Sequence, residues 1–205
     1  MSSIKYKCLQ CGICCKTKYL CLYPHELDKA FELAYKHNIS LNLEPIRYKI
    51  DFKNKIIIDL IYRVTVRPCP FFKNNKCIIH ENRFIACRKY PFSNWLKTPD
   101  LFVKLLKFPK YFHEIDENCT FIKKFYGNNS KNISIKIFDA EYNALLNDIK
   151  TYESIEKRLK FLSMTNKIEL KKEIKFKNEN PELYKFILEN WEHIPFENYS
   201  SFDFY

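Results

Sequence analysis

The chain has 205 residues, with nine cysteines and only two glycines, where average usage would give about 14 glycines. A P-loop needs two glycines and a dinucleotide-binding turn needs three, but Gly12 and Gly127 lie far apart in the sequence. Glycine-built nucleotide sites are therefore excluded. The net charge is +11, and residues 1–100 carry 18 basic and 8 acidic side chains, against 17 and 16 in residues 101–205. The basic excess therefore lies in the same half as most of the cysteines.

The N-terminal segment predicts a cytoplasmic protein. Residues 1–7 contain no apolar run of the kind found in a signal peptide, and no stretch of about 18 apolar residues follows. Thiols are kept reduced in the cytoplasm, so the cysteines are interpreted as metal ligands or catalytic groups before disulfides. The chain is 46% hydrophobic and 17% aromatic, which is enough to bury a core. We expect no membrane partner.

In chain order, the first expected element is a ligand loop over residues 8–15, where Gly12 supplies a tight bend. Apolar residues at helical spacing predict a helix that begins near Pro24 and continues to residue 35. Alternating and β-branched residues predict a hairpin over residues 45–66. A turn at residues 74–75 and a short strand over residues 101–106 follow.

The C-terminal part of the sequence predicts helices. Residues 127–130 give the strongest linker signal. Helical spacing over residues 138–162 predicts a long helix, and Asn180 followed by Pro181 predicts the N-cap and first position of a last helix. We predict an α+β fold: a cysteine-cluster metal-binding domain over residues 1–125, irregular and containing a β-hairpin and a helix, followed by a helical C-terminal region over residues 131–205.

The spacing of the first cysteines predicts metal binding. Cys8, Cys11 and Cys14 follow a Cys-x2-Cys-x2-Cys pattern, which can bring three thiolates into one small volume, as in iron–sulfur ligand loops. Structural zinc sites more often use two Cys-x2-Cys pairs, so the spacing favours iron–sulfur without excluding zinc. Cys15 follows directly, and adjacent side chains diverge, so Cys14 and Cys15 rarely reach one metal. This indicates two sites, or one site and a spare thiol.

The number of cysteines favours two sites. Cys21 alternates with Tyr19 and Tyr23 and is interpreted as a core thiol, with a ligand role as its alternative. We expect the first three cysteines to share one centre with one distal cysteine, and Cys15 to join the other three. The eight candidate metal ligands, two sets of four, are Cys8, Cys11, Cys14, Cys15, Cys69, Cys77, Cys87 and Cys119.

Five elements in sequence order resemble the CxxCxxCC, or YkgJ-like, family of zinc- or iron-chelating cysteine-cluster proteins. These elements are the segments 8–15, 69–72, 77–83 and 87–91 and the final Cys119. The resemblance implies a metal-binding site formed by the same eight cysteines. The chain departs from the family pattern at Phe84, where proline is usual after arginine, and at the additional Cys21. Neither departure removes a ligand.

The resemblance implies a site more than an activity. A branch with a similar cluster is the flagellin lysine-N-methylases, which implies an S-adenosylmethionine-dependent protein modification. This chain is short for that branch and lacks the glycines of an ordinary methyltransferase cofactor turn. The expected cofactor is an iron–sulfur cluster, of the 4Fe-4S type, or zinc. Metal ions are the expected partners, together with a protein substrate or partner.

Side chains near the cysteines allow two interpretations each. His80 could replace a cysteine as ligand, since imidazole suits zinc and iron, but a surface or hydrogen-bonded histidine is the favoured reading. Arg88 could donate to metal-bound sulfur or form a salt bridge. Tyr90 and Phe92 are expected in the core. No general acid and base pair and no nucleophile elbow is found, so the sequence assigns no catalytic residue.

The function expected is metal binding by a cysteine cluster, with a cluster-dependent protein-modifying or redox activity. The alternative is a structural-zinc module that binds nucleic acid through its basic residues. That alternative is disfavoured because the basic residues are dispersed and the aromatic residues keep core spacing.

Overall fold

The computed structural model describes residues 4–97, 111–127 and 133–201. Helices and small sheets alternate along the chain, which confirms the predicted α+β class. By their contacts, the residues form two compact units, each made of two chain segments: Met1–Leu20 with Arg67–Lys150, and Cys21–Val66 with Thr151–Tyr205. None of the described helices is both long and apolar enough to cross a membrane.

The first unit contains the cysteine-rich segments and has short elements. Its strands pair as two antiparallel hairpins, β4 with β5 and β6 with β7. Asn74 and Asn75 both have positive φ, which confirms the predicted turn, between β4 and β5. The elements are α1 (Ile13–Thr17), β4 (Phe72–Lys73), β5 (Lys76–Cys77), η2 (His80–Asn82), α3 (Ile85–Arg88), β6 (Phe92–Lys97), β7 (Tyr111–Ile115), α5 (Thr120–Tyr126) and η4 (Ile135–Ile137).

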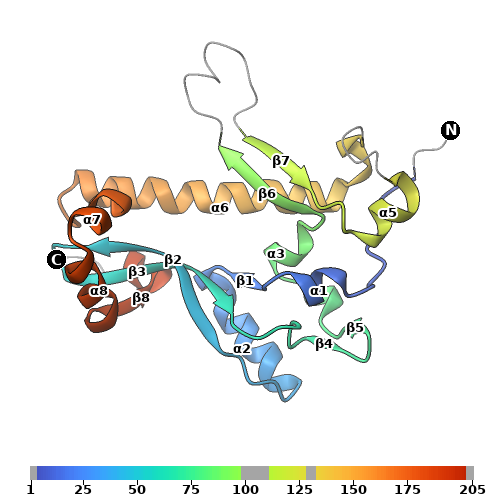
Figure 1. Ribbon diagram of the computed structural model, residues 1–205, viewed down its shortest axis with the longest axis horizontal. Coiled ribbons are helices and arrows are strands. Elements are labelled where there is room, and N and C mark those ends of the chain that lie inside the picture. The colour runs from blue at the N-terminus through green and yellow to red at the C-terminus, as the bar shows by residue number, and fades with distance from the viewer. Residues whose placement is uncertain (1–3, 98–110, 128–132, 202–205) are drawn as a thin grey trace, which may run out of the picture. The chain divides into compact units, whose positions relative to one another are not determined.

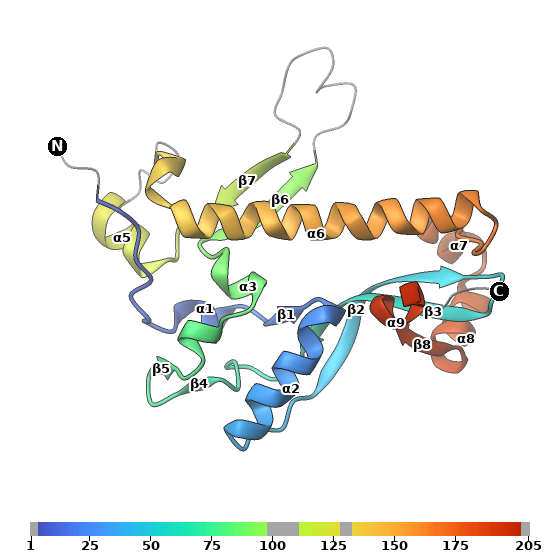
Figure 2. The ribbon, with the colours of Figure 1, turned by 180° about the vertical axis from the view of Figure 1, so that it is seen from behind.

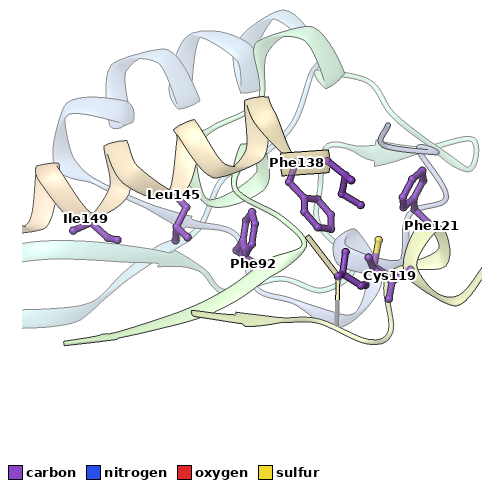
Figure 3. Close-up of a cluster of buried hydrophobic side chains, with 9 residues drawn as sticks. Phe92, Cys119, Phe121, Phe138, Leu145 and Ile149 are labelled. Atoms are coloured by element: carbon purple, nitrogen blue, oxygen red, sulfur yellow. The ribbon is translucent and has the colours of Figure 1, made fainter. Parts of the chain in front are cut away.

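The long helix α6 (Asp139–Met164) confirms the periodicity predicted over residues 138–162 (Figure 1). Its first part belongs to an apolar cluster of the first unit, shown in Figure 3. Along this cluster, Ile149 lies at one end and Cys119 and Phe121 lie at the other, with Phe92 and Phe138 between them. The segment around Cys119 is therefore anchored by apolar packing, as well as by its own backbone hydrogen bonds.

The second unit is built on a four-stranded sheet (Figure 1). The predicted hairpin is present as β2 (Leu43–Asp51) and β3 (Ile56–Val64), which pair antiparallel. The strand β1 (Cys21–Leu22) pairs antiparallel with the end of β3, and β8 (Glu192–Pro195) pairs parallel with its beginning (Figure 2). Ile57, Ile58 and Leu60 are buried, because β3 has strand partners on both edges and packed side chains around it.

The remaining elements of the second unit are helical. The helix predicted near Pro24 begins as a single 3-10 turn and continues as an α-helix, with Ala30, Leu33 and Ala34 on its buried side. Phe176, Tyr184 and Ile187 pack with hairpin residues in an apolar cluster. The elements are η1 (Pro24–Glu26), α2 (Leu27–Lys36), α7 (Glu173–Glu179), α8 (Pro181–Asn190) and α9 (Phe196–Ser201).

The last helix begins at Pro181 as predicted, but Asn180 makes no side-chain cap. Its side-chain amide donates instead to the carbonyl oxygen of Phe176 at 3.5 Å, because α7 ends at the residue before it. The strand predicted over residues 101–106 and all of the predicted linker except Gly127 lie outside the described residues.

A buried carboxylate joins the hairpin to the C-terminal segment in the second unit. Asp51 has no solvent exposure, and it accepts hydrogen bonds from four groups. The backbone amides of Lys53 and Glu169 donate to its Oδ1 at 3.1 and 3.0 Å. The Tyr199 hydroxyl donates to Oδ2 at 3.0 Å, and so does the side-chain amide of Asn54. This carboxylate therefore satisfies donors from three separate parts of the chain.

We predict that Asp51→Ala lowers the free energy of unfolding by about 3 kcal/mol, because it leaves several buried donors without a partner. Glu32→Ala, on the exposed side of α2, is the matched control and should change stability by less than about 0.5 kcal/mol. Equilibrium urea denaturation followed by tryptophan fluorescence measures both. A loss below about 1 kcal/mol for the Asp51 variant would mean that this carboxylate does not hold the segments together.

Candidate metal centre

The first cysteines lie on a bend followed by one short helix. Gly12 has φ of 75°, in the left-handed region that favours glycine, and confirms the expected bend. The helix α1 begins directly after it, with the amide of Lys16 donating to the carbonyl oxygen of Gly12 at 2.9 Å. The segment over residues 8–15, predicted to be loop throughout, is thus helical from Ile13, and Cys14 and Cys15 stand on the first turn.

Gly12 is also required by close packing. A Cβ atom at this position would lie 2.2 Å from two ring carbons of Phe72, the residue that opens β4. The ammonium group of Lys16 lies over the same ring, 5.3 Å from its centroid. The amide of Cys69 donates to the carbonyl oxygen of Cys15 at 2.8 Å. These contacts hold the two cysteine regions against each other, although more than 50 residues separate them in the sequence.

Seven of the eight candidate ligands border one cavity. The cavity has a volume of about 40 Å³ accessible to a water-sized sphere, which is room for a few atoms beside the thiols. Cys69 does not border it, although it is buried nearby and interacts electrostatically with Cys14 and Cys77. The lining residues are Tyr6, Cys8, Leu9, Gln10, Cys11, Gly12, Cys14, Cys15, Cys77, His80, Arg83, Cys87, Tyr90, Cys119 and Phe121.

The neighbouring thiols of Cys14 and Cys15 do not diverge as expected. Their Sγ atoms lie 4.0 Å apart. Two thiolates bound tetrahedrally to one zinc ion at about 2.3 Å each would lie about 3.8 Å apart. Rotation about χ1 brings these sulfurs together although their Cα–Cβ bonds point in different directions. Adjacency in the sequence therefore does not prevent the two thiols from serving one metal, or two metals that are close neighbours.

The donor set suits a soft or borderline metal. Thiolates and imidazole are the ligands that zinc and iron–sulfur centres use, and none of the described residues that line the cavity is an aspartate or a glutamate. Within the described ranges, no three Cys, His, Asp or Glu side chains are grouped as a metal ion would hold them. His80 also contributes a buried Nε2 atom that has no hydrogen-bond partner. The residues fit zinc or iron by chemistry, and side-chain rotation must complete the coordination.

Burial and hydrogen bonds shift the ionisation of the thiols. A hydrogen bond with Cys15 lowers the pKa of Cys77 to about 6 and also lowers the pKa of Cys14. The guanidinium of Arg83 favours the ionised form of both. Hydrogen bonds with Cys14 and Cys77 raise the pKa of Cys15. Burial raises the pKa of the remaining affected thiols, among them Cys69 to about 11. The thiols with a pKa raised mainly by burial are Cys8, Cys69, Cys87 and Cys119.

Polar side chains that the sequence did not single out contact the thiols. The Thr120 hydroxyl donates to Sγ of Cys11 at 3.0 Å, and the Tyr6 hydroxyl lies 3.8 Å from Sγ of Cys119. In the sequence, only the position of Thr120 directly after Cys119 indicates that its hydroxyl lies near the thiols. Arg88 is exposed and is not among the residues that line the cavity, whereas Arg83 lines it.

Outside the cavity, Cys21 is half-buried on β1 of the second unit. It is not among the residues that line the cavity. Phe92 is buried in the apolar cluster, as predicted. Tyr90 packs against that cluster, and it also lines the cavity with a hydroxyl that is buried without a partner.

We predict that Gly12→Ala lowers both stability and bound metal, because the new methyl group meets Phe72. Gly127→Ala is the matched control, since Gly127 also has positive φ but no atom of the described residues lies within 4 Å of its Cβ position. Backbone strain should cost Gly12→Ala about 1 kcal/mol and Gly127→Ala, whose ψ is −128°, about 1–3 kcal/mol. The clash should cost Gly12→Ala about 2 kcal/mol more and lower its bound metal, which Gly127→Ala should keep. Denaturation curves and metal content per chain are the measurements. An equal loss of bound metal in the two variants would contradict the packing argument.

Comparison with known proteins agrees with this site. Searches of curated proteins and of solved structures give no match. A family model described as "Putative zinc- or iron-chelating domain" matches residues 7–120, which is more than half of the chain and contains all eight candidate ligands. The chain therefore belongs to the CxxCxxCC family of zinc- or iron-chelating domains.

Proposed function

We propose that the eight cysteines form the metal site of this protein, that the metal is iron in clusters of the 4Fe-4S type, and that the clusters serve a redox or protein-modifying reaction. The observation that carries the proposal is the meeting of seven thiols from four chain segments at one cavity. Free cysteines pack singly as small apolar groups. Metal binding explains why seven thiols gather at one cavity. Zinc, with the same ligands, is the second candidate.

The contacts support a division of the thiols into two neighbouring groups. Cys119 lies within electrostatic range of Cys11, and the hydroxyl of Tyr6 lies beside it and near Cys8. We therefore assign Cys119 as the distal ligand that joins the first motif. The first group is Cys8, Cys11, Cys14 and Cys119.

The second group gathers around Cys15. Its thiol hydrogen bonds with Cys77, and Cys87 lies within electrostatic range of Cys69 and Cys77. Cys87 also lies within electrostatic range of Cys14, the member of the first group that is next to Cys15. Because Sγ of Cys14 and Sγ of Cys15 are 4.0 Å apart, metals held by the two groups would be close neighbours. Neighbouring clusters can pass an electron between them, which is the chemistry that iron–sulfur groups supply when bound.

The remaining residues of the cavity set the surroundings of the metal. Tyr6, Tyr90 and Phe121 line it with aromatic surface, which lowers the local dielectric and limits access of water. Arg83 supplies a positive charge close to thiols of both groups, including Cys8 and Cys87. Donors and charge near metal-bound sulfur favour the reduced, more negative state. We assign the protein to a reducing compartment, the cytoplasm, where such thiols stay available for metal.

Metal analysis of anaerobically purified protein tests the proposal. Two 4Fe-4S clusters would give a brown protein with about 8 Fe per chain. Cys14→Ser should lower the iron content by at least half, whereas the matched control Cys21→Ser should keep it. A colourless protein with about 2 Zn per chain would mean that the bound metal is zinc and not iron. Equal loss of metal in both variants, or no bound metal in the wild type, would reject it.

Metal binding should also release protons, and this gives a pH dependence. The thiols whose pKa is raised by burial are protonated at neutral pH and must lose their protons to bind metal. Lower pH therefore weakens metal binding, and higher pH strengthens it. Calorimetric titration of metal-free protein with Zn²⁺ in buffers of different ionisation enthalpy should show release of several protons per chain. Release of fewer than about two would contradict the protonated state of these thiols.

A further inference from the structure

His80 is a metal-binding side chain that stands among the thiols. It opens the 3-10 turn η2, three residues after Cys77, and it lines the cavity. Its side chain is 19% exposed. The imidazole lies close enough to Cys77 to interact electrostatically with its thiol. A nitrogen donor therefore lines the same cavity as the thiols.

The two ring nitrogens of His80 have different environments. Nδ1 lies 3.1 Å from Oε1 of Glu81. A carboxylate accepts hydrogen bonds, so Nδ1 carries the proton and Nε2 presents a lone pair. Nε2 is buried and has no hydrogen-bond partner among the residues that the structure describes. Buried polar atoms without a partner are uncommon, and one that lies beside a set of metal ligands calls for an explanation.

The backbone holds this ring in place. The Nε of Arg83 donates to the carbonyl oxygen of His80 at 3.0 Å. The amide of Asn82 donates to the carbonyl oxygen of Ile79 at 2.9 Å, and Ile79 is buried. The turn that carries His80 is therefore fixed on both sides. A carboxylate on one ring nitrogen and a metal on the other is a common arrangement of metal-bound histidines.

We propose that Nε2 of His80 is a metal ligand of the second group, in the position that the eight-cysteine count gives to Cys69. Seven thiols and the imidazole of His80 border the cavity, which gives eight donors without Cys69. The second centre is then held by three thiolates and one imidazole, from Cys15, Cys77, Cys87 and His80. Cys69 instead connects the two cysteine regions, because its backbone amide donates a hydrogen bond to the carbonyl oxygen of Cys15. This inference rests on the proposed function and changes one of its ligands: His80 takes the place of Cys69, and the other seven cysteines keep their roles.

X-ray absorption at the K-edge of the metal carried by the purified protein, iron or zinc, tests the assignment. Wild-type protein should show imidazole scattering in addition to sulfur. His80→Ala should lose the imidazole scattering and about half of the bound metal. The matched control His37→Ala changes a histidine of the second unit, outside the cavity, and should leave both unchanged.

Two further variants distinguish a metal ligand from a residue that only supports the site. Cys69→Ser should keep the imidazole scattering and the metal content, with circular dichroism confirming that it is folded. Glu81→Gln should keep the imidazole but weaken metal binding about tenfold, since the carboxylate orients the ring. Bound metal with sulfur scattering alone in the wild type would overturn the role of His80 and leave the proposed function intact. Absence of bound metal would overturn both.

Discussion

The first unit depends on one constraint: thiolates that carry like charge must come together at a small cavity. Ionised sulfurs at this distance repel one another, and the repulsion is strong where water is excluded. In the protein alone, the conflict is relieved by protonation, because burial raises the pKa of thiols such as Cys87 and Cys119, and by the positive charge of Arg83. A metal cation relieves it more completely. The basic excess of the N-terminal half fits the same need.

The protein positions its candidate ligands with ordinary packing. Cys119 lies at the end of an apolar cluster that includes Phe138 and the first part of α6 (Figure 3). The amide of Tyr6 donates to the carbonyl oxygen of Ile137 at 2.8 Å, which places the chain just before Cys8 beside the same cluster. Gly12 allows close contact with the β4 strand. The second unit has its own core and its own buried polar centre at Asp51.

The elements that could be predicted are those whose residues signal locally. The 26 residues of α6 and the β2–β3 hairpin have strong periodicity, and both lie where the pattern predicted them. The short helix α1 was missed because five residues are too few for a periodic signal. The cap expected at Asn180 failed because α7 ends just before it, so the side chain turns to Phe176. The candidate ligands could be selected from spacing and family likeness, but their contacts could not.

The sequence by itself determined the kind of chemistry available: scarce glycine excludes familiar nucleotide sites, and the spacing of cysteines indicates a metal site. These conclusions follow from residue types and local spacing alone. Only the tertiary structure decided which thiols border the same cavity, that Cys69 stands apart from it, and that Nε2 of His80 is buried there without a partner. The physical reason is that these relations join segments separated by up to about 100 residues. Side-chain rotation and long-range packing set them, and no local pattern encodes either.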